Sequence, residues 1–242
     1  MSKLLFFHPD LNNDSFFLSE EESKHLTRVL RKKNGDTVHF MNGNGIEAIG
    51  IITGDHSKQV QIQISERIEH PLTKKYKFHL AIAPTKNNER IEWMLEKCTE
   101  IGIDEITFLN CSNSERSQLK LDRFSKILIS ALKQSKQFHL PKLNEQVSFE
   151  TFVKQKQHQY SNKFIAWCES DLASNLNNKM AQLPINQTTE LIFLIGPEGD
   201  FTAAEVALAK SHYFEPVSLG KNILRTETAG IYVCSVFANH FQ

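Results

Sequence analysis

The chain has 242 residues, with 28 basic and 28 acidic side chains, and 40% of its residues are hydrophobic. This length can bury one large core or two modest ones, so one or two domains are possible. Because the formal net charge is zero, a partner selected by bulk charge alone is excluded, and local clusters must carry any such preference.

Cysteine and histidine spacing excludes further classes of protein. The four cysteines form no C-x-x-C pair, which argues against a disulfide framework or zinc ribbon and indicates reduced thiols. The ten histidines form no H-x-x-x-H or H-E-x-x-H pattern, so no metal site is expected. No segment approaches the roughly 20 apolar residues of a membrane span, and the N-terminus lacks the apolar region of a signal peptide. We therefore expect a cytoplasmic protein with no membrane role.

The N-terminal part of the chain is predicted to form strands around one helix. Ser19 and the acids after it form a capping box, and Asn34-Gly35 is a stop signal, so a helix is predicted over Glu20–Lys33. Turn signals and alternating apolar residues predict three strands, which suggest a small meander closing into a barrel: Thr37–Met41, Ile46–Thr53 and Lys58–Ser65.

From Tyr76 onwards, short apolar runs alternate with helical patterns, which predicts a parallel sheet covered by helices. The predicted strands are Phe78–Ala83, Ile103–Leu109, Phe164–Trp167, Leu191–Ile195 and Val217–Leu219. The predicted helices are Asn88–Ile101, Asp122–Gln137, Thr202–Ser211 and Thr226–Phe241. The change of pattern near His70-Pro71 predicts two domains, over residues 1–71 and 72–242.

The stretch LIFLIGPEGD, from Leu191 to Asp200, leaves a buried strand through a glycine-rich turn and precedes a helix that opens at Thr202. An α/β sheet places ligand-binding backbone amides at such a position. The alternative is a plain strand-to-helix connection that uses glycine for a tight turn. The spacing matches neither a Walker loop nor G-x-G-x-x-G.

A second loop of this kind follows the strand Val217–Leu219. Gly220 leads through Arg225 into a helix that starts at Thr226, so we expect the two loops to converge on one pocket. A cation such as Arg225 beside a helix N-terminus is electrostatically unfavourable, which indicates an anionic group there. The alternative is a surface arginine paired with a carboxylate such as Glu227.

The two loops carry a resemblance to a known family. LIGPEGDFT and LGKNILRTETA resemble the C-terminal signature of the RsmE family of 16S ribosomal RNA uridine-N3 methyltransferases, members of the trefoil-knotted SPOUT superfamily. Lys136 stands where many relatives have arginine, and Asp200 stands where many have glycine. Three other blocks resemble the same family, so nearly the whole chain is covered: HLTRVLRKKNGD from His25, KNNERIEWMLEKCTEIGIDEITFLNCSNSERS from Lys86, and SALKQSKQFHLPKL from Ser130.

The resemblance implies an α/β protein with a C-terminal SPOUT-type knotted methyltransferase domain and a small N-terminal PUA-like β-barrel domain that binds RNA. It also implies S-adenosylmethionine as methyl donor, a homodimer, and 16S ribosomal RNA of the 30S subunit as partner. General topology rules argue against threaded chains, so the knot follows from the resemblance alone.

The resemblance further implies that the two glycine loops hold the cofactor. Small residues let backbone amides and carbonyls reach adenine and ribose, while Ile and Leu cover the ring faces. A third wall is expected near Cys168 and Glu169. The residues implied to bind the cofactor are Ile195, Gly196, Pro197, Gly199, Leu219, Gly220, Ile223, Leu224 and Thr226.

Methylation at N3 of uracil requires loss of the imide proton, so the resulting anion must be stabilised. Arg225 stays protonated and can donate to the negative charge that develops on a uracil carbonyl oxygen. Glu198 and Glu227 are the candidate proton acceptors. For Glu198 the alternative is a carboxylate that fixes its own loop by accepting backbone N–H bonds.

Two basic clusters are candidate RNA-binding surfaces. The first comprises Lys24, Arg28, Arg31, Lys32 and Lys33. The second includes Arg116, Gln134 and Lys136. The alternatives are a solvated helix end whose cations complement the helix dipole, and the charged face of an ordinary amphipathic helix.

The predicted helix Thr226–Phe241 is apolar nearly all round, which is typical of a helix covered on both sides. This fits packing on its own sheet and on a second subunit. The alternative is a wholly internal helix in a monomer.

Two other functions stay open at this point. One is ribose 2′-O methylation within the same superfamily, although the chain lacks the N-terminal Asn-and-Arg motif by which those enzymes resemble one another. The other is non-catalytic ribosomal RNA binding by a protein that keeps the knot. Intact GPEG and ILRTETA sequences argue against the second, because a decayed pocket would not need them.

Overall fold

The computed structural model describes residues 4–56, 58–115, 119–156, 159–168, 174–184 and 189–241. The chain forms two compact units. The N-terminal unit comprises Met1–Leu72 together with Leu132–Leu140, and the α/β unit comprises Thr73–Ala131 and Pro141–Gln242.

The N-terminal unit is a curled five-stranded sheet in the order β1-β3-β4-β5-β2. Its strands are β1 (Leu5–Phe7), β2 (Ser15–Phe17), β3 (Thr37–Met41), β4 (Ile46–His56) and β5 (Gln59–Glu69). All neighbours are antiparallel except β1 and β3. The predicted alternation holds in β5, where Val60, Ile62 and Ile64 are buried. The rings of His8 and Phe16 stack 3.9 Å apart, which brings the two edges of the sheet together over the core.

The predicted helix Glu20–Lys33 is wrong in its length. Ser19 does cap the helix, since its Oγ accepts the Glu22 N–H at 3.2 Å. However, the α-helix ends early, and the chain continues as one π-helical turn, in which the Leu30 N–H donates to His25 O at 3.1 Å. Arg31 then adopts a left-handed conformation with φ 55°, which ends the helical path before the predicted stop. The two segments are α1 (Glu20–Lys24) and η1 (His25–Val29).

The segment Leu132–Leu140 completes the core of the N-terminal unit. Leu132 packs with Leu5 and Met41 in a small cluster. The Phe138 ring stacks on His70 with ring centroids 3.6 Å apart, and Phe138 O accepts the Gly45 N–H at 2.8 Å.

The α/β unit is built on a seven-stranded, wholly parallel sheet in the order β10-β12-β9-β11-β6-β7-β8. Its strands are β6 (Tyr76–Ile82), β7 (Glu105–Asn110), β8 (Lys142–Ser148), β9 (Asn162–Ala166), β10 (Ser174–Asn175), β11 (Thr189–Ile195) and β12 (Glu215–Ser218). The helices are α2 (Asn88–Ile101), α3 (Leu121–Ser135), α4 (Phe149–Lys156), α5 (Leu176–Met180), α6 (Ala203–Ser211) and α7 (Thr226–Phe241), and the residues of α3 from Leu132 onwards are counted with the N-terminal unit.

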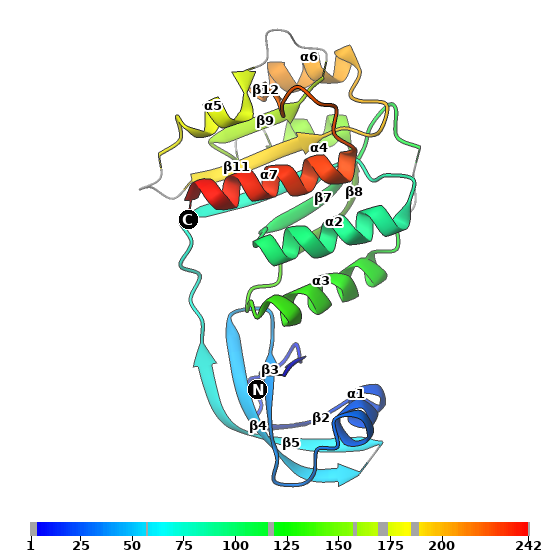
Figure 1. Ribbon diagram of the computed structural model, residues 1–242, viewed down its shortest axis with the longest axis vertical. Helices are drawn as coiled ribbons and strands as arrows, with labels where there is room; N and C mark the ends of the chain where they lie inside the picture. Colours follow the sequence, from blue (N-terminus) through cyan, green and yellow to red (C-terminus); the bar gives the residue numbers. More distant parts are fainter. Residues whose placement is uncertain are drawn as a thin grey trace. The chain divides into compact units, whose positions relative to one another are not determined.

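Helices cover both faces of the parallel sheet, with α2 and α7 on one face and α4 and α6 on the other (Figure 1). The central strand β11 is therefore buried from Leu191 to Ile195, which explains its unbroken apolar run. On the α7 face, the ring of Phe237 packs against Phe78 and Phe193 at centroid distances of 4.5 and 6.0 Å. The predicted α/β class with a small N-terminal β unit is confirmed.

Four elements of the α/β unit were not predicted from the sequence. Strand β8 lies at an edge and is largely polar, with no apolar run to mark it. Strand β10 has two residues, and helix α5 has five. Helix α4 directly follows β8 and has only eight residues, too few for a clear helical period.

No helix in the described part of the chain combines the length and apolar character that a membrane crossing requires. Across the same residues, no three His, Cys, Asp or Glu side chains gather in a metal-binding arrangement. None of the four cysteines, all of which lie in the described part of the chain, forms a disulfide bond.

Candidate active site

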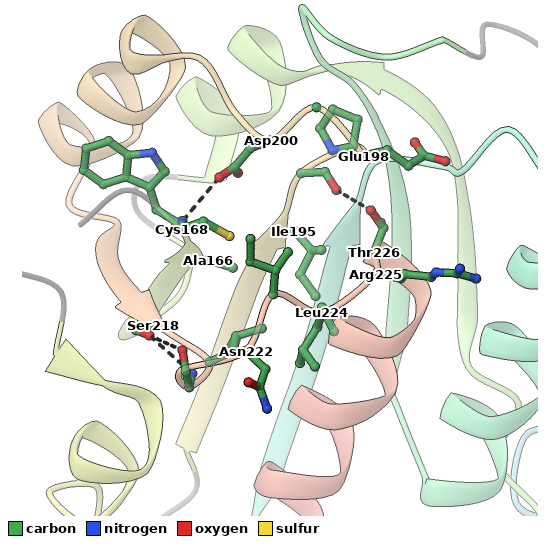
Figure 2. A pocket seen from close by; sticks show the side chains of 18 of the residues that line it. Ala166, Cys168, Ile195, Glu198, Asp200, Ser218, Asn222, Leu224, Arg225 and Thr226 are labelled. Carbon is green, nitrogen blue, oxygen red and sulfur yellow. Dashed lines mark hydrogen bonds between the residues drawn. The ribbon is translucent and has the colours of Figure 1, made fainter. Parts of the chain in front are cut away.

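A cavity of about 540 Å³ lies at the carboxyl ends of β9, β11 and β12, where the loops after these strands meet (Figure 2). Parallel strands end at the same edge of a sheet, which is where α/β proteins bind ligands. The nine residues that the resemblance assigns to the cofactor all line this cavity, together with Glu198 and Arg225. The remaining lining residues are Ala166, Trp167, Cys168, Asp200, Ser218, Lys221, Asn222 and Ala229.

The loop after β11 is held in a fixed shape from both ends. The carbonyl oxygen of Gly196 accepts a hydrogen bond from Thr226 Oγ1 at 3.1 Å. A Cβ at position 196 would lie 3.1 Å from the Phe201 nitrogen, so the close approach requires glycine. At the other end, Thr202 and Glu205 form a complete capping box that starts α6.

The loop after β12 presents glycine and apolar side chains to the cavity. Gly220 has φ +134°, and a Cβ there would meet no other atom within 4 Å. Ser218 Oγ accepts the Gly220 N–H at 3.2 Å and so fixes the turn. Ile223 is 86% exposed, which is unusual for an isoleucine and leaves its side chain available to cover a bound apolar ring.

The third wall comes from the end of β9. Cys168 lines the cavity as expected, whereas Glu169 lies outside the described residues. Trp167 was not singled out from the sequence, and its lining position follows from the strand end that was predicted there. The Cys168 N–H donates to Asp200 Oδ2 at 3.2 Å and links this wall to the loop after β11.

The three predicted catalytic residues do not lie together. Arg225 and Glu198 both line the cavity. Their side chains extend towards the same side of it (Figure 2). Glu198 Oε1 accepts the Lys86 N–H at 3.2 Å, which is the loop-fixing contact considered as its alternative.

Glu227, in contrast, is buried on the other side of Thr226. It does not line the cavity, and it borders a small space among apolar residues of α2 and β6. Its Oε1 lies 3.7 Å from Arg90 Nε, and its Oε2 has no hydrogen-bond partner among the described residues. No ion pair joins Glu227 to Arg225 in the part of the chain that the structure describes, so the simple pairing considered for Arg225 is absent there.

Sequence reasoning missed Asn113, in the loop after β7. Its Nδ2 donates to the carbonyl oxygens of Gly199 and Asp200 at 3.0 and 3.1 Å. The neighbouring Ser112 N–H donates to Glu205 Oε1 at 2.8 Å. These contacts span 86 residues or more, and no local pattern could have identified them.

The predicted RNA-binding residues that the structure describes all belong to the N-terminal unit. Five of them have exposed side chains: Arg28, Arg31, Lys33, Gln134 and Lys136. Lys24 pairs with Glu20 at 2.6 Å, and Lys32 Nζ lies 3.5 Å from Thr37 O. Arg116 lies outside the described residues.

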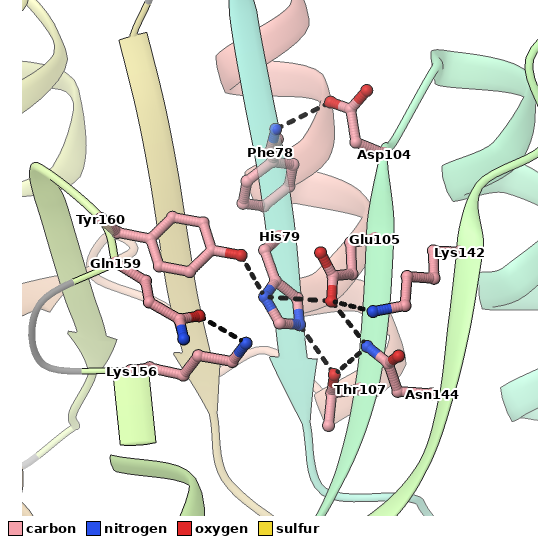
Figure 3. Close-up of polar contacts among 10 residues, drawn as sticks. All are labelled: Phe78, His79, Asp104, Glu105, Thr107, Lys142, Asn144, Lys156, Gln159 and Tyr160. Carbon is pink, nitrogen blue, oxygen red and sulfur yellow. Dashed lines mark hydrogen bonds and ion pairs between the residues drawn. The ribbon is translucent and has the colours of Figure 1, made fainter. Parts of the chain in front are cut away.

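A second polar cluster lies away from the cavity, within the sheet (Figure 3). His79 is fully buried, and its Nδ1 and Nε2 lie 2.8 Å from Tyr160 Oη and Thr107 Oγ1 respectively. Asn144 Nδ2 donates to Thr107 Oγ1 and Glu105 Oε1, both at 2.7 Å. Burial lowers the pKa of His79 to about 3, so the imidazole is neutral at pH 7 and completes a structural network.

Comparison with known proteins identifies the family. The family model described as an RNA methyltransferase domain matches residues 72–238, and the model described as an RNA methyltransferase PUA domain matches residues 18–65. The ribosomal RNA small subunit methyltransferase E of Mesomycoplasma hyopneumoniae is 30% identical over 94% of this chain and 96% of its own length.

Solved structures agree with this assignment. A probable rRNA-methyltransferase from Porphyromonas gingivalis is 33% identical, with a TM-score of 0.87 over 97% of each chain. A Legionella pneumophila protein named as a methyltransferase, in complex with the bound cofactor SAM, is 28% identical, with a TM-score of 0.85 over 99% of this chain and 98% of its own. The chain therefore belongs to the ribosomal RNA small subunit methyltransferase E family.

Proposed function

We propose that the protein transfers the methyl group of S-adenosylmethionine to N3 of one uridine in the 16S ribosomal RNA of the small subunit. The observation that carries this proposal is the cavity at the carboxyl ends of β9, β11 and β12, which gathers all nine residues that the family resemblance assigns to the cofactor. The solved relative with bound SAM supports the same choice of methyl donor.

The chemistry of the cavity fits this cofactor. Gly220 leaves open the space that any side chain would fill, so a ligand can approach the backbone of the loop closely. Ile223 and Leu224 offer apolar surface for the adenine ring, and uncharged backbone groups of the loops offer hydrogen bonds to its edge. When bound, S-adenosylmethionine supplies an electrophilic methyl group on a positively charged sulfonium.

Arg225 and Glu198 are assigned the chemical roles. The Arg225 guanidinium donates hydrogen bonds to the negative charge that develops on a uracil carbonyl oxygen. Glu198 accepts the imide proton, because it is the predicted carboxylate that lines the cavity and shares a side of it with Arg225 (Figure 2). Glu227 has a structural role: its ion pair with Arg90 joins α2 to the start of α7.

The N-terminal unit is assigned to RNA binding. We propose that residues 1–71 form a PUA-like RNA-binding domain and residues 72–242 a SPOUT methyltransferase domain. The exposed basic residues Arg28, Arg31 and Lys33 contact phosphates, and Lys24, Lys32, Arg116, Gln134 and Lys136 extend this contact.

We further propose a cytoplasmic homodimer whose C-terminal segment is knotted. After β12, at the far side of β9, the chain returns over the strand ends so that α7 packs against β6 and β11, and this crossing supports a threaded path. On α7 itself, Ile231, Tyr232 and Val236 remain only half-buried, which supports a partner subunit over this face.

The proposal is tested by methyl transfer. Purified protein is incubated with radiolabelled S-adenosylmethionine and 30S subunits from cells that lack the gene, and label in the 16S RNA is counted. We expect label with the wild-type protein and none with Gly220→Val. Failure of the folded wild-type protein to label the RNA would contradict the proposal and favour a non-catalytic RNA-binding protein.

A further inference from the structure

We propose that Asp200 makes the cavity favour the positively charged methyl donor over its uncharged product. This inference rests on the proposed function, because it concerns the same cavity. It adds a determinant of specificity that neither the glycine loops nor Arg225 supplies.

The carboxylate of Asp200 is fixed in the cavity wall by its own hydrogen bonds. Oδ1 accepts the Phe201 N–H at 2.7 Å, and Oδ2 accepts the Cys168 N–H at 3.2 Å. The backbone is fixed as well, since Asp200 O accepts Asn113 Nδ2 at 3.1 Å. The side chain therefore joins the loop after β11 to the end of β9 and stays in one place beside the cavity (Figure 2).

The backbone conformation shows that the side chain at this position is not required by the turn. Asp200 has φ 58°, a left-handed conformation that glycine adopts without strain. Aspartate tolerates this conformation better than most residues, and here its side chain bonds two neighbouring amides. A glycine would serve the turn alone, whereas aspartate adds a negative charge to the cavity.

The charge of Asp200 is not neutralised by an ion pair among the described residues, where no Lys, Arg or His nitrogen lies within 4.0 Å of its carboxylate. Three other charged residues line the cavity. The side chains of Glu198 and Arg225 extend towards the other side of the cavity (Figure 2). The exposed Lys221 lies in the loop after β12. Asp200 is therefore the charge fixed into the wall between β9 and β11.

The methyl donor and its product differ in charge at the sulfur atom. S-adenosylmethionine carries a sulfonium, and loss of its methyl group leaves S-adenosylhomocysteine with a neutral thioether and an otherwise identical structure. A fixed negative charge attracts the first more strongly, and the attraction is greater inside a cavity than in bulk water. Asp200 thus helps the enzyme to bind donor and release product at every turnover.

The test measures the dissociation constants of S-adenosylmethionine and S-adenosylhomocysteine by calorimetry, with the fluorescence of Trp167 in the cavity wall as a second readout. Asp200→Asn removes the charge and keeps tolerance of the backbone angle, and its single side-chain oxygen can accept one of the two N–H groups that Asp200 now accepts. We expect it to weaken donor binding by about three- to tenfold, as a charge pair of this kind predicts, and to leave product binding nearly unchanged. Asp200→Gly should lose the same preference. As a control, Glu150→Gln removes the charge of an exposed side chain on α4, which does not line the cavity, and should change neither constant.

The outcomes separate this inference from the proposed function. If Asp200→Asn weakens both ligands equally, or neither, Asp200 only shapes the loop and the inference is wrong while the cofactor assignment stands. If the wild-type protein binds neither ligand, the proposed function fails and the inference fails with it.

Discussion

The hydroxyl group of Thr226 lies 3.1 Å from the carbonyl oxygen of Gly196 and joins the first residue of α7 to the loop after β11. The two residues are 30 positions apart, and each belongs to one of the two glycine loops around the cavity. This buried hydrogen bond therefore sets the relative position of the two walls between which the cofactor is proposed to bind.

Thr226→Val should weaken both the fold and the cavity. The substitution keeps the shape of the side chain but leaves Gly196 O without its donor, at a cost of about 1–2 kcal/mol in the free energy of unfolding. Affinity for S-adenosylmethionine should fall several-fold, as measured by calorimetry. Thr226→Ser retains the hydroxyl and should stay near the wild type. Wild-type stability and affinity in the valine variant would show that the bond is unimportant.

Gly220→Val should block the cofactor by placing a side chain in open space beside the cavity. The positive φ of Gly220 also disfavours any β-branched residue. We expect at least about a tenfold loss of affinity for S-adenosylmethionine. The matched control is Gly54→Ala in β4, where the new Cβ makes an ordinary contact at 3.6 Å. Unchanged affinity in Gly220→Val would place the binding site elsewhere.

Arg225→Ala should slow methyl transfer without weakening the binding of S-adenosylmethionine. Because Arg225 is exposed, its loss should change the free energy of unfolding by no more than about 0.5 kcal/mol. The rate of methyl transfer should fall by about 10² or more if the guanidinium stabilises the uracil anion. Affinity for S-adenosylmethionine should stay unchanged, and near-normal turnover would remove Arg225 from the mechanism.

His79 should make the protein sensitive to acid. The unfolded chain binds a proton at this side chain near the ordinary pKa of 6.5, whereas burial lowers the pKa to about 3 in the folded protein. Its contribution to stability is thus complete above pH 6.5 and is lost as the pH falls towards 3, by about 1.4 kcal/mol per unit.

The loss should reach about 2–3 kcal/mol at about pH 4.5, as measured by urea unfolding. His79→Gln should flatten this part of the pH dependence. An NMR titration of the wild-type imidazole gives an independent check, and a midpoint near 6.5 for His79 would contradict the account.

Reversing two charges in the N-terminal unit should weaken RNA binding. Arg28→Glu with Arg31→Glu should lower the affinity for a 16S RNA fragment at low salt, and the slope of affinity against salt should decrease by about one for each lost phosphate contact. The matched control reverses Lys154 and Lys210 on helices α4 and α6 of the other unit. If the slope of RNA affinity against salt did not change, the segment that contains Arg28 and Arg31 would have only a structural role.

The cavity was predictable because its parts are local patterns. Around Gly196 a buried strand, a glycine turn and a capped helix are close in sequence, and around Gly220 a short strand leads through a glycine turn into α7. Parallel strands bring such turns to one edge of the sheet. The resemblance to the RsmE family rests on the same two loops, and family membership is confirmed.

The side chains around the start of α7 were harder to predict. Each helical residue is rotated by about 100° from the one before it, so Thr226 faces the loop at Gly196 while Glu227 turns towards Arg90 on α2. Sequence alone gives neither the direction of the first helical residue nor the packing of α2 against α7. The same limit applies to Asn113, whose contacts depend on the tertiary fold.

Backbone conformation explains the remaining differences. The chain changes from α1 to a π-helical turn at His25, and Leu26 in this turn is fully buried in the core. No residue pattern marks the change, because the same residues are compatible with a regular helix. Strand β8 was missed because an edge strand with half-exposed polar residues lacks an apolar signal.

Nucleoside analysis of the methylated RNA distinguishes N3 methylation of uridine from the other possible reactions. 16S RNA from 30S subunits lacking the modification is treated with the protein and S-adenosylmethionine, digested to nucleosides and resolved by mass spectrometry against standards. We expect one new N3-methyluridine per RNA, absent from the Arg225→Ala reaction. A 2′-O-methylated nucleoside, or no new nucleoside from protein that binds the cofactor, would contradict the proposed function.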